Sequence, residues 1–509
     1  MQFFKRRAVR LLLLSLSGLL IVLCGTSRAA DSKTLTVAIE PVYAPFEFKA
    51  ADGSLQGFDV DIMRAIGEAA GFQVKFQSIA FDGMIPALQV GNVDAAVAAM
   101  TITPKRAEAI SFSRPYFKAG LAIATPKGDP PIATVEELEG KTVAVQIGTT
   151  GAEAVKQVAN VNVRTFNAAV LALQELSNGN VDAVLSDAPV MLYAIKTGNL
   201  KDVEINSELL SEELYGIPTP LNSPNLPLID KGLTIILENG TYESLYRKWF
   251  NAQPPQLPSV APGIAQSSQQ TALSSRNVIL NALPALIKGA LVTLQLTILS
   301  GILGLIGGSL LGIARLSAMK PLRWLARAYI DFFRGTPLLV QIFMVYFGIP
   351  ALVQALGFEF AFDRFLAAVI ALTLNCAAYV AEIVRGGIQS IETGQTEAAQ
   401  SMGMSAVQTM QFVVFPQAFR RMLPPLGNQF ISLLKDTSLV AIIGFEELFR
   451  EGQLIVAENY RPFELYAIVA VIYLVLTLLS SQAFSYLEKR MNPVQRSLKP
   501  QIQPSSDLA

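Results

Sequence analysis

The sequence predicts an α/β domain followed by an all-α membrane domain, and three observations predict this order. Over residues 31–250, short apolar runs such as KTLTVAIE and KTVAVQIG alternate with helix-like stretches such as DVDIMRAIGEAAG, which is the pattern of α/β domains. Residues 251–275 are rich in Pro, Gln and Ser without periodicity, and they predict a linker. Five long apolar segments follow, each about long enough to cross a bilayer.

The composition limits the classes of protein to which the chain belongs. Hydrophobic residues make up 51% and charged residues 16% of its 509 residues, which favours a membrane protein. Its 40 Lys and Arg balance its 40 Asp and Glu, so we expect no nucleic-acid partner. Histidine is absent, which excludes Ser-His-Asp triads and the usual zinc-hydrolase sites. The two cysteines, Cys24 and Cys376, lie in apolar segments, so we expect neither disulfides nor a metal site.

The N-terminus carries the features of an export signal. Four Lys or Arg residues between positions 5 and 10 precede an apolar core, and small residues follow around 27–30. This order predicts a signal peptide over residues 1–30. A retained membrane anchor is the alternative. Both interpretations place residues 31–250 outside the cytoplasmic membrane.

The apolar segments predict five membrane spans, at about 286–313, 338–357, 364–384, 430–447 and 464–486. With the N-terminal domain outside, the inner loops 314–337 and 385–429 and the tail carry twelve Lys or Arg residues, against three outside. This bias follows the positive-inside rule. It predicts a membrane domain over 276–490, a cytoplasmic tail over 491–509, and a cytoplasmic position for the segment between the third and fourth spans.

That cytoplasmic segment carries a motif, EAAQSMG at 397–403, followed by nine residues and then VVFP. It resembles the EAA loop of ABC importer permeases. Glu397, Ala398, Ala399, Gly403 and Pro416 match, whereas Val and Phe at 413 and 415 stand where Ile and Leu are usual. FFRGTPLLVQ, YVAEIVRGGIQSI and LLKDTSLVAIIG resemble the polar amino acid subfamily of these permeases. The resemblance covers residues from about 285 to 487.

The resemblance implies that this loop docks into a separate cytoplasmic ABC ATPase, which binds ATP and Mg. The chain itself then needs no cofactor and is not an enzyme. The small Ala398 and Ala399 allow a close approach, Gly403 permits the turn, and Pro416 is expected to end the second helix. Glu397 is expected to cap or pair at the docking face. An amphipathic helix on the membrane surface is the alternative.

The N-terminal domain carries PVYAPFEFKAADGSLQGFDVDIM and AMTITPKRAEAISFSRPYF. These stretches resemble bacterial extracellular solute-binding proteins for polar amino acids. The resemblance covers about 35–250 and implies a two-lobed α/β periplasmic binding protein fold. The chain is expected to cross the hinge near 118–124 and 213–218.

The segment TITPKRAEA predicts a helix start capped by Thr103. Arg106 in its first turn opposes the helix dipole, which suggests that its guanidinium faces an anion such as an α-carboxylate. A solvated surface Arg is the alternative. By resemblance, Thr101 and the backbone at Ala99 complete this carboxylate site.

The remaining candidates come from the same resemblance. Asp187 follows the strand-like AVLS and is either a helix cap or the partner of the ligand's α-ammonium at a strand end. Tyr43 and Phe81 match aromatic positions around the ligand, although an isolated aromatic at either position reads more simply as core. The second lobe's contact loop holds Gln146, Thr149 and Thr150.

Glu40 matches an acidic position that touches the far end of the ligand in relatives. A carboxylate there favours arginine, lysine or glutamine and disfavours glutamate and aspartate by like-charge repulsion. Within the spans, the polar residues Thr293, Gln295, Thr297, Asn375 and Glu382 are candidates for a solute path, with helix packing as the alternative.

Together the resemblances imply ATP-driven import of polar amino acids across the bacterial inner membrane, by a receptor fused to a permease. One permease module per chain implies a homodimer, or a heterodimer with a second permease, surrounded by membrane lipid. A ligand-gated channel or amino-acid sensor is the first alternative, and an enzyme on a binding-protein scaffold is the second.

Overall fold

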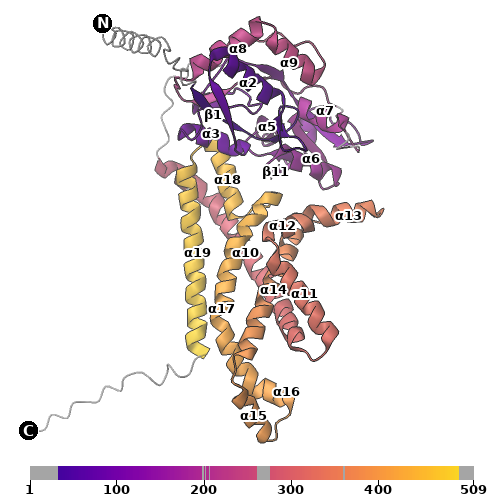
Figure 1. Ribbon diagram of the computed structural model, residues 1–509, viewed down its shortest axis with the longest axis vertical. Coiled ribbons are helices and arrows are strands. Elements are labelled where there is room, and N and C mark those ends of the chain that lie inside the picture. The colour runs from indigo at the N-terminus through magenta and orange to yellow at the C-terminus, as the bar shows by residue number, and fades with distance from the viewer. Residues whose placement is uncertain are drawn as a thin grey trace, which may run out of the picture.

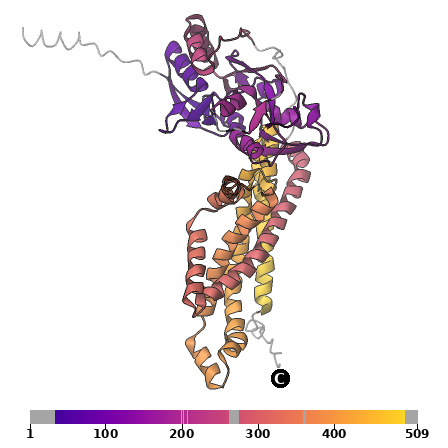
Figure 2. The ribbon, with the colours of Figure 1, turned by 90° about the vertical axis from the view of Figure 1, so that its right-hand side faces the viewer.

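The structure, a computed structural model, describes residues 33–197, 200, 202–205, 207–260, 275–358 and 362–491. The predicted signal peptide, most of the predicted linker and nearly all of the predicted tail lie outside these residues. An α/β domain sits at one end of an elongated helical bundle, and helices α15 and α16 lie at the opposite end (Figure 1). A view turned by 90° shows the same order along the long axis (Figure 2).

The N-terminal domain has two lobes. The first lobe, residues 33–116 and 216–250, is built on a parallel three-stranded sheet in the order β5-β1-β6, with two small antiparallel sheets. Its strands are β1 (Thr34–Ile39), β2 (Val42–Tyr43), β3 (Glu47–Lys49), β4 (Leu55–Gln56), β5 (Gln73–Ser78), β6 (Ala95–Ala96), β7 (Ile110–Phe112) and β15 (Pro218–Pro220). Its helices are α2 (Phe58–Ala70), α3 (Phe81–Gln89), α4 (Pro104–Ala107), α8 (Leu226–Glu238) and α9 (Thr241–Phe250).

Helix α2 shows how the sequence builds this lobe. Its apolar residues recur at helical spacing, and Phe58, Ile62, Met63 and Ile66 are fully buried on one face. The helix ends at Gly71, whose φ of 81° is the left-handed conformation that glycine adopts readily. The buried face of α2 closes one side of the lobe's core.

The second lobe, residues 120–212, is built on a five-stranded mixed sheet in the order β11-β10-β12-β9-β13. Its strands are β9 (Leu121–Pro126), β10 (Thr142–Gln146), β11 (Asn162–Phe166), β12 (Ala183–Asp187) and β13 (Val203–Ile205). Its helices are α5 (Thr150–Val155), α6 (Ala169–Ser177) and α7 (Ala188–Lys196), with a 3₁₀ turn at Glu136–Leu138.

Two short strands join the lobes. β8 (Phe117–Ala119) pairs antiparallel with β14 (Glu213–Tyr215), and each runs from one lobe into the other. The predicted crossings near 118–124 and 213–218 therefore coincide with a two-stranded hinge.

The helical domain contains five helices that lie side by side in the bundle (Figure 1). These are α10 (Ser275–Leu316), α11 (Lys320–Gly335), α14 (Arg364–Gln389), α17 (Phe415–Asp436) and α19 (Pro462–Met491). Shorter helices connect them: α12 (Leu338–Phe343), a π-helical turn (Met344–Gly348), α13 (Ile349–Ala355), α15 (Thr393–Ser401), α16 (Ala406–Thr409), a second π-helical turn (Met410–Val414), a 3₁₀ turn (Thr437–Ile443) and α18 (Leu448–Asn459).

Close contact between α10 and α14 depends on glycines. Gly304, Gly308 and Gly312 recur every four residues and face α14. A Cβ on Gly308 would lie 2.6 Å from the carbonyl oxygen of Ala377, so a larger residue there would push the helices apart. Small residues at such spacing are typical of packed membrane helices.

Among the described residues, three helices are long and apolar enough to cross a membrane: Asn277–Leu316, Arg364–Gln389 and Pro462–Met491. A fourth candidate is the pair Lys320–Gly335 and Leu338–Val353, bent by 107° at its break. The helical domain is therefore present, but the predicted count of five spans is not established.

Two predicted spans have wrong boundaries. Residues 430–447 are not one helix, because α17 ends at Asp436 and a 3₁₀ turn leads to Gly444 with a φ of 70°. Residues 338–357 are also not a straight span, since a π-helical turn interrupts them. The segment 314–337, expected to be a loop, contains helix α11. In the two spans an apolar run continued across a local break that hydropathy does not register. Helix α11 was missed because it is amphipathic and carries five charged residues.

The EAA segment forms a helix, a turn and a second helix, as expected. Gly403 has a φ of 83° in the turn, and Ala399 is buried while Glu397 and Ala398 are exposed. Glu397 lies inside α15 and does not cap it, because the N-cap is Glu392. The expectation that Pro416 ends the second helix is wrong. Helical backbone continues through the π-helical turn Met410–Val414 into α17, and Pro416 lies just after this turn, whose wider hydrogen-bond pattern accommodates a residue without an N–H.

Candidate functional site

A narrow cavity lies between the two lobes of the N-terminal domain. The structure brings all ten predicted ligand-site residues to this cavity, together with Ala98. The first lobe contributes Glu40, Tyr43, Phe81, Ala99, Thr101 and Arg106, and the second contributes Gln146, Thr149, Thr150 and Asp187. Because these side chains come from eight separate segments, their convergence depends on the fold and not on sequence proximity. Their role in binding remains a prediction.

Arg106 is a buried cation in this cavity. Thr103 caps α4 by accepting a hydrogen bond from the Arg106 backbone N–H, which fixes where the side chain starts. The side chain is 4% exposed, so the alternative of a solvated surface Arg is wrong. Nη1 donates to the Thr101 carbonyl at 2.6 Å and Nη2 donates to the Gly148 carbonyl at 2.9 Å. The guanidinium also lies over the Phe81 ring, 5.4 Å from its centroid.

Arg106 forms no salt bridge with a carboxylate among the described residues, although Asp187 lies near enough to interact with its charge. Its two carbonyl acceptors come from different lobes, Thr101 from the first and Gly148 from the second. A buried guanidinium without a counter-ion is costly. An α-carboxylate in the cavity would relieve that cost through bidentate hydrogen bonds.

Asp187 is a buried carboxylate at the end of β12. Its Oδ2 accepts hydrogen bonds from the hydroxyls of Tyr43 at 2.7 Å and Tyr215 at 2.5 Å. Although Asp187 is the N-cap residue of α7, its side chain makes no capping hydrogen bond, so the helix-cap alternative is wrong. Burial raises the pKa of Asp187 to about 7, and the nearby Glu213 carboxylate acts in the same direction.

Glu40 is the second buried carboxylate of the cavity, at 4% exposure. Its Oε2 accepts from Gln146 Nε2 at 2.8 Å, and its Oε1 accepts from the Phe81 backbone N–H at 3.3 Å. Burial raises the pKa of Glu40 to about 7, although these hydrogen bonds lower it. A cation arriving at the cavity would restore the ionised form, because an opposite charge favours it.

Glu213, a buried carboxylate in hinge strand β14, was not predicted from the sequence. Its Oε2 accepts from the Thr101 hydroxyl at 2.5 Å and from the Thr150 hydroxyl at 3.0 Å. It therefore orients one predicted site residue in each lobe from the hinge. The only sequence signal was its position within the predicted crossing at 213–218.

A second missed residue is Asp59, behind the cavity wall. Its Oδ2 accepts from the Ala99 backbone N–H and the Tyr116 hydroxyl, both at 2.8 Å. Ala99 has a φ of 46°, a conformation that costs a non-glycine residue about 1 kcal/mol or more. The buried Asp59 thus holds the strained backbone that lines the cavity. Burial raises the pKa of Asp59 to about 6.

Helix α18 of the helical domain lies against both lobes near this cavity. Arg450 is fully buried and donates through Nη2 to the Thr165 carbonyl at 2.7 Å and hydroxyl at 3.0 Å. Its Nη1 donates to the side chain of Asn167, whose carbonyl also accepts from the cavity residue Gln146. Arg450 thus connects the helical domain to the cavity wall through two residues.

Other contacts of α18 reach the first lobe and the outer face of the second. Tyr460, which ends α18 with a φ of 56°, packs against the buried apolar cluster of the first lobe that includes Met84 and Ile85. Lys156 of the second lobe pairs with Glu458. Figure 1 shows α18 directly beneath the N-terminal domain. The helix therefore contacts the two lobes where they meet.

The polar residues predicted for a solute path have different surroundings. Thr293 donates to Glu447 at 3.2 Å, Thr297 donates to the Thr293 carbonyl at 2.7 Å, and Asn375 donates to Gln341 at 2.9 Å. These three are buried, whereas Gln295 is exposed. These hydrogen bonds are equally consistent with the alternative that the polar residues serve packing between helices.

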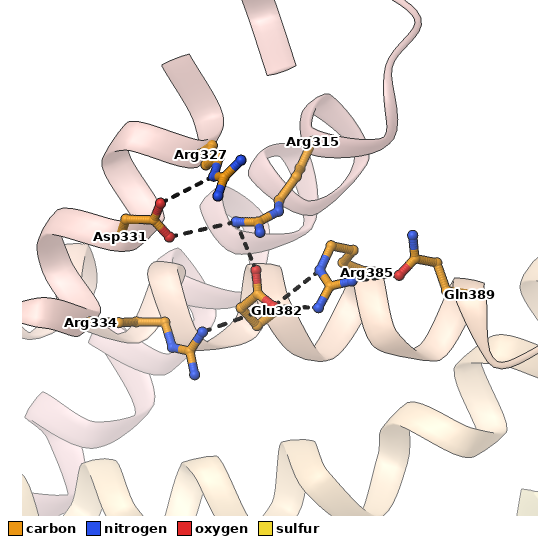
Figure 3. A network of polar contacts seen from close by, with 7 residues as sticks. All are labelled: Arg315, Arg327, Asp331, Arg334, Glu382, Arg385 and Gln389. Carbon is orange, nitrogen blue, oxygen red and sulfur yellow. Dashed lines mark hydrogen bonds and ion pairs between the residues drawn. The ribbon is translucent and has the colours of Figure 1, made fainter. Parts of the chain in front are cut away.

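Glu382 lies among arginines, as Figure 3 shows. Its carboxylate is 3.0 Å from Arg315, 2.7 Å from Arg385 and 3.9 Å from Arg334. A carboxylate already held by three guanidiniums is a poor contact for a passing solute. These ion pairs fit the packing alternative for Glu382, and its place on a solute path stays a prediction.

Comparison with known proteins follows the division into two domains. Residues 35–252 match the model of the bacterial extracellular solute-binding proteins, family 3. Residues 304–493 match the model of the binding-protein-dependent transport system inner membrane component.

Individual relatives divide in the same way. The glutamine transport system permease protein GlnP of Escherichia coli K12 is 43% identical over 210 residues, which is 41% of this chain and 94% of the relative. The arginine transport system permease protein ArtQ of Bacillus subtilis is 39% identical over 209 residues, covering 41% of this chain and 93% of the relative. Among solved structures, an ancestral arginine-binding protein bound to arginine is 44% identical, covering 43% of this chain and 98% of its own, with a TM-score of 0.42.

Both families cover their domains almost from end to end, and both are found here in one polypeptide. The chain belongs to the binding-protein-dependent transport system inner membrane components and carries a family 3 extracellular solute-binding domain fused to its N-terminal side.

Proposed function

We propose that this protein is the fused receptor and permease of an ABC importer for polar amino acids. The observation that carries the proposal is one closed cavity lined by a buried cation, Arg106, and two buried carboxylates, Glu40 and Asp187. An amino acid with a polar or cationic side chain offers the complementary set of charges. The families and relatives matched by both halves support import and give no support to a channel or sensor.

In this proposal each charge has one role. Arg106 holds the α-carboxylate, since a guanidinium suits bidentate binding. The Thr101 hydroxyl donates its one hydrogen to Glu213 in the free cavity, so it must turn from Glu213 to donate to the α-carboxylate. Asp187 pairs with the α-ammonium. Glu40, with Gln146 beside it, receives the far end of the ligand. Arginine, lysine and glutamine are therefore the preferred substrates, and glutamate and aspartate are disfavoured by repulsion from Glu40.

We also propose five membrane crossings, by α10, the bent pair Lys320–Gly335 and Leu338–Val353, α14, α17 and α19. The long helices lie side by side in the bundle (Figure 1). Three of the proposed crossings precede the 397–416 loop, and because three is an odd number, this loop and the N-terminal domain lie on opposite sides of the membrane. The N-terminal domain then faces the outside of the bacterial inner membrane. Thr293, Gln295 and Asn375 remain candidates for the solute path through the bundle.

The energy source in this proposal is a separate ABC ATPase, which binds ATP and Mg and engages the 397–416 loop. Exposed apolar side chains on that loop support docking of a protein partner, because such a patch is costly in water. They include Met402 at 84%, Val407 at 74% and Phe412 at 63% exposure. Two chains related by a two-fold axis, or one chain with a second permease, would complete the translocation unit.

The test is calorimetry on the full chain in lipid nanodiscs, titrated with arginine, lysine, glutamine, histidine, glutamate and aspartate in turn. Arg106→Ala should weaken binding of every ligand by at least roughly hundredfold, since it removes charge-assisted hydrogen bonds to the shared α-carboxylate. The neighbouring Lys105→Ala is the matched control, because Lys105 is exposed and pairs with Glu153.

Three results would count against the proposal. Tight binding of glutamate or aspartate would overturn the role of Glu40. Unchanged binding in Arg106→Ala would overturn the carboxylate site. Binding of none of the six amino acids would overturn the substrate class.

A further inference from the structure

A second charged cavity lies at the end of the bundle remote from the N-terminal domain, where α10, α11 and α14 meet. It has a volume of about 430 Å³. Five cationic residues line it, and its lining contains no Asp or Glu. These cations are Arg315, Lys320, Arg323, Arg327 and Arg385, and Trp324 lies among them.

Ion pairs hold part of this lining in place. Arg315 and Arg385 share the carboxylate of Glu382, at 3.0 Å and 2.7 Å. Arg327 pairs with Asp331 at 3.4 Å. Figure 3 shows both carboxylates contacted by guanidiniums that come from three different helices. The carboxylates thus orient the arginines while remaining outside the cavity lining.

The charges of this cluster do not balance. The cluster contains two carboxylates, Glu382 and Asp331, and six cations, which are the five of the lining and Arg334. Lys320 and Arg323 have no ion pair with any residue in the described part of the chain, and both are exposed. Such an excess of positive charge in a preformed hollow favours an anion with several acceptor oxygens, such as a phosphate.

The surface beside the cavity is apolar. Leu310 and Ile313 on α10 are 65% and 57% exposed, and Trp324 and Leu325 on α11 are 66% and 60% exposed. A soluble phosphate makes no use of such a surface, whereas acyl chains do. Tryptophan next to lysine and arginine is also typical of the bilayer interface.

We propose that this cavity binds the phosphate headgroup of an anionic phospholipid from the inner leaflet, with its acyl chains against the exposed apolar faces of α10 and α11. Basic pockets between transmembrane helices on the cytoplasmic side suit such headgroups. The bound lipid would offset the repulsion between the arginines and tie the three helices together. The proposal depends on the membrane placement of the bundle and not on which amino acid the N-terminal domain binds.

The position of Trp324 allows a local test in the full chain. Only two tryptophans are present, so Trp249→Phe leaves Trp324 as the single tryptophan reporter. The chain is reconstituted in phosphatidylcholine vesicles containing increasing fractions of brominated phosphatidylglycerol, which quenches tryptophan on contact. Lys320→Ala/Arg323→Ala removes two cations from the cavity. Arg420→Ala/Lys489→Ala, at exposed positions on α17 and α19, removes the same charge elsewhere and is the matched control.

We expect half-maximal quenching at a low fraction of brominated phosphatidylglycerol. The cavity variant should need roughly thirtyfold more, because each Lys or Arg near an anionic lipid contributes about fivefold. The control variant should be unchanged. Equal quenching by brominated phosphatidylcholine, or an unchanged curve in the cavity variant, would overturn the proposal. Loss of quenching on adding glycerol 3-phosphate to the buffer would overturn the lipid as the source and assign the site to a soluble phosphate.

Discussion

Glu40→Gln should weaken the affinity for the ligand arginine far more than the affinity for the ligand glutamine. The amide keeps the shape of the side chain and removes its charge, and it also replaces one of the two oxygens that accept from Gln146 and the Phe81 backbone N–H with a donor group. A hydrogen bond to a charged group contributes about 1.5–3 kcal/mol. Glu40→Gln should therefore weaken arginine binding by roughly 10- to 100-fold, with a much smaller effect on glutamine.

The pH dependence follows from two raised pKa values. Glu40 and Asp187 both have a pKa of about 7 in the free cavity. A bound cation favours the ionised carboxylate, so below pH 7 binding must release the proton that the free protein holds. Affinity is then highest above pH 7 and falls as the pH drops below it, by at most about tenfold per pH unit for each proton released.

The two ligands should release different numbers of protons. Every amino acid brings an α-ammonium to Asp187, whereas only arginine or lysine brings a second cation to Glu40. Glutamine affinity should thus fall by up to about tenfold per pH unit and arginine affinity by up to about 100-fold. In Glu40→Gln, arginine affinity should fall with decreasing pH only as steeply as glutamine affinity does.

Calorimetry of the full chain between pH 5.5 and 8, in buffers of different ionisation enthalpy, measures both the affinity and the protons released. Glu136→Gln, at an exposed position, is the control for loss of a carboxylate. Equal pH slopes for arginine and glutamine in the unmodified protein would refute the reasoning. So would an arginine affinity in Glu40→Gln equal to that of the unmodified protein.

Three further predictions concern stability, docking and coupling. In the absence of ligand, the raised pKa of Glu40 makes its contribution to stability decline as the pH rises from about 4.5 to about 7. Glu40→Gln should therefore raise the free energy of unfolding at pH 8 by up to about 3 kcal/mol, measured as a higher melting temperature. An equal gain at pH 4 would contradict this. Arg450→Ala should increase amide hydrogen exchange in β11, where it removes the hydrogen bonds to the second lobe, while Arg461→Ala should not, and unchanged exchange would argue against docking through α18. Gly403→Val should destabilise the left-handed turn by about 1–2 kcal/mol and reduce ligand-stimulated ATP hydrolysis by the partner ATPase. Gly394→Val is the control, because a Cβ at Gly394 meets no atom and its φ is not positive. This variant should leave the ATP hydrolysis intact.

Most of the cavity residues were predicted by resemblance to a known family, and the structure brings them to one cavity; Arg106 was also predicted from a local motif. Arg106 follows a Thr-Pro helix start that has the same geometry in the structure, with Thr103 as the cap. Glu213 was not predicted, since its role depends on the hinge bringing Thr101 and Thr150 to the same carboxylate. The local pattern of residues around Glu213 contains no information on a contact with residues so far away in the sequence.

The membrane domain was predicted less well for a related reason. Hydropathy reads an apolar 3₁₀ turn at 437–443 and an apolar helix in the same way, so the fourth span was placed too far along the chain. Proline at 416 was expected to stop a helix, but it lies just after a π-helical turn, whose wider hydrogen-bond pattern accommodates it. The contact of Arg450 with Thr165 joins positions far apart in the chain, and only the tertiary arrangement reveals it.

The position of α18 has a thermodynamic consequence. This helix contacts both lobes while they are closed over the cavity, through Arg450 on one side and Tyr460 on the other. If docking favours the closed form, then by linkage docking and amino acid binding must strengthen each other by the same factor. A docked receptor then holds its cargo more firmly than a free one. In the proposed importer, the work of opening the lobes then becomes part of what ATP hydrolysis by the partner has to supply.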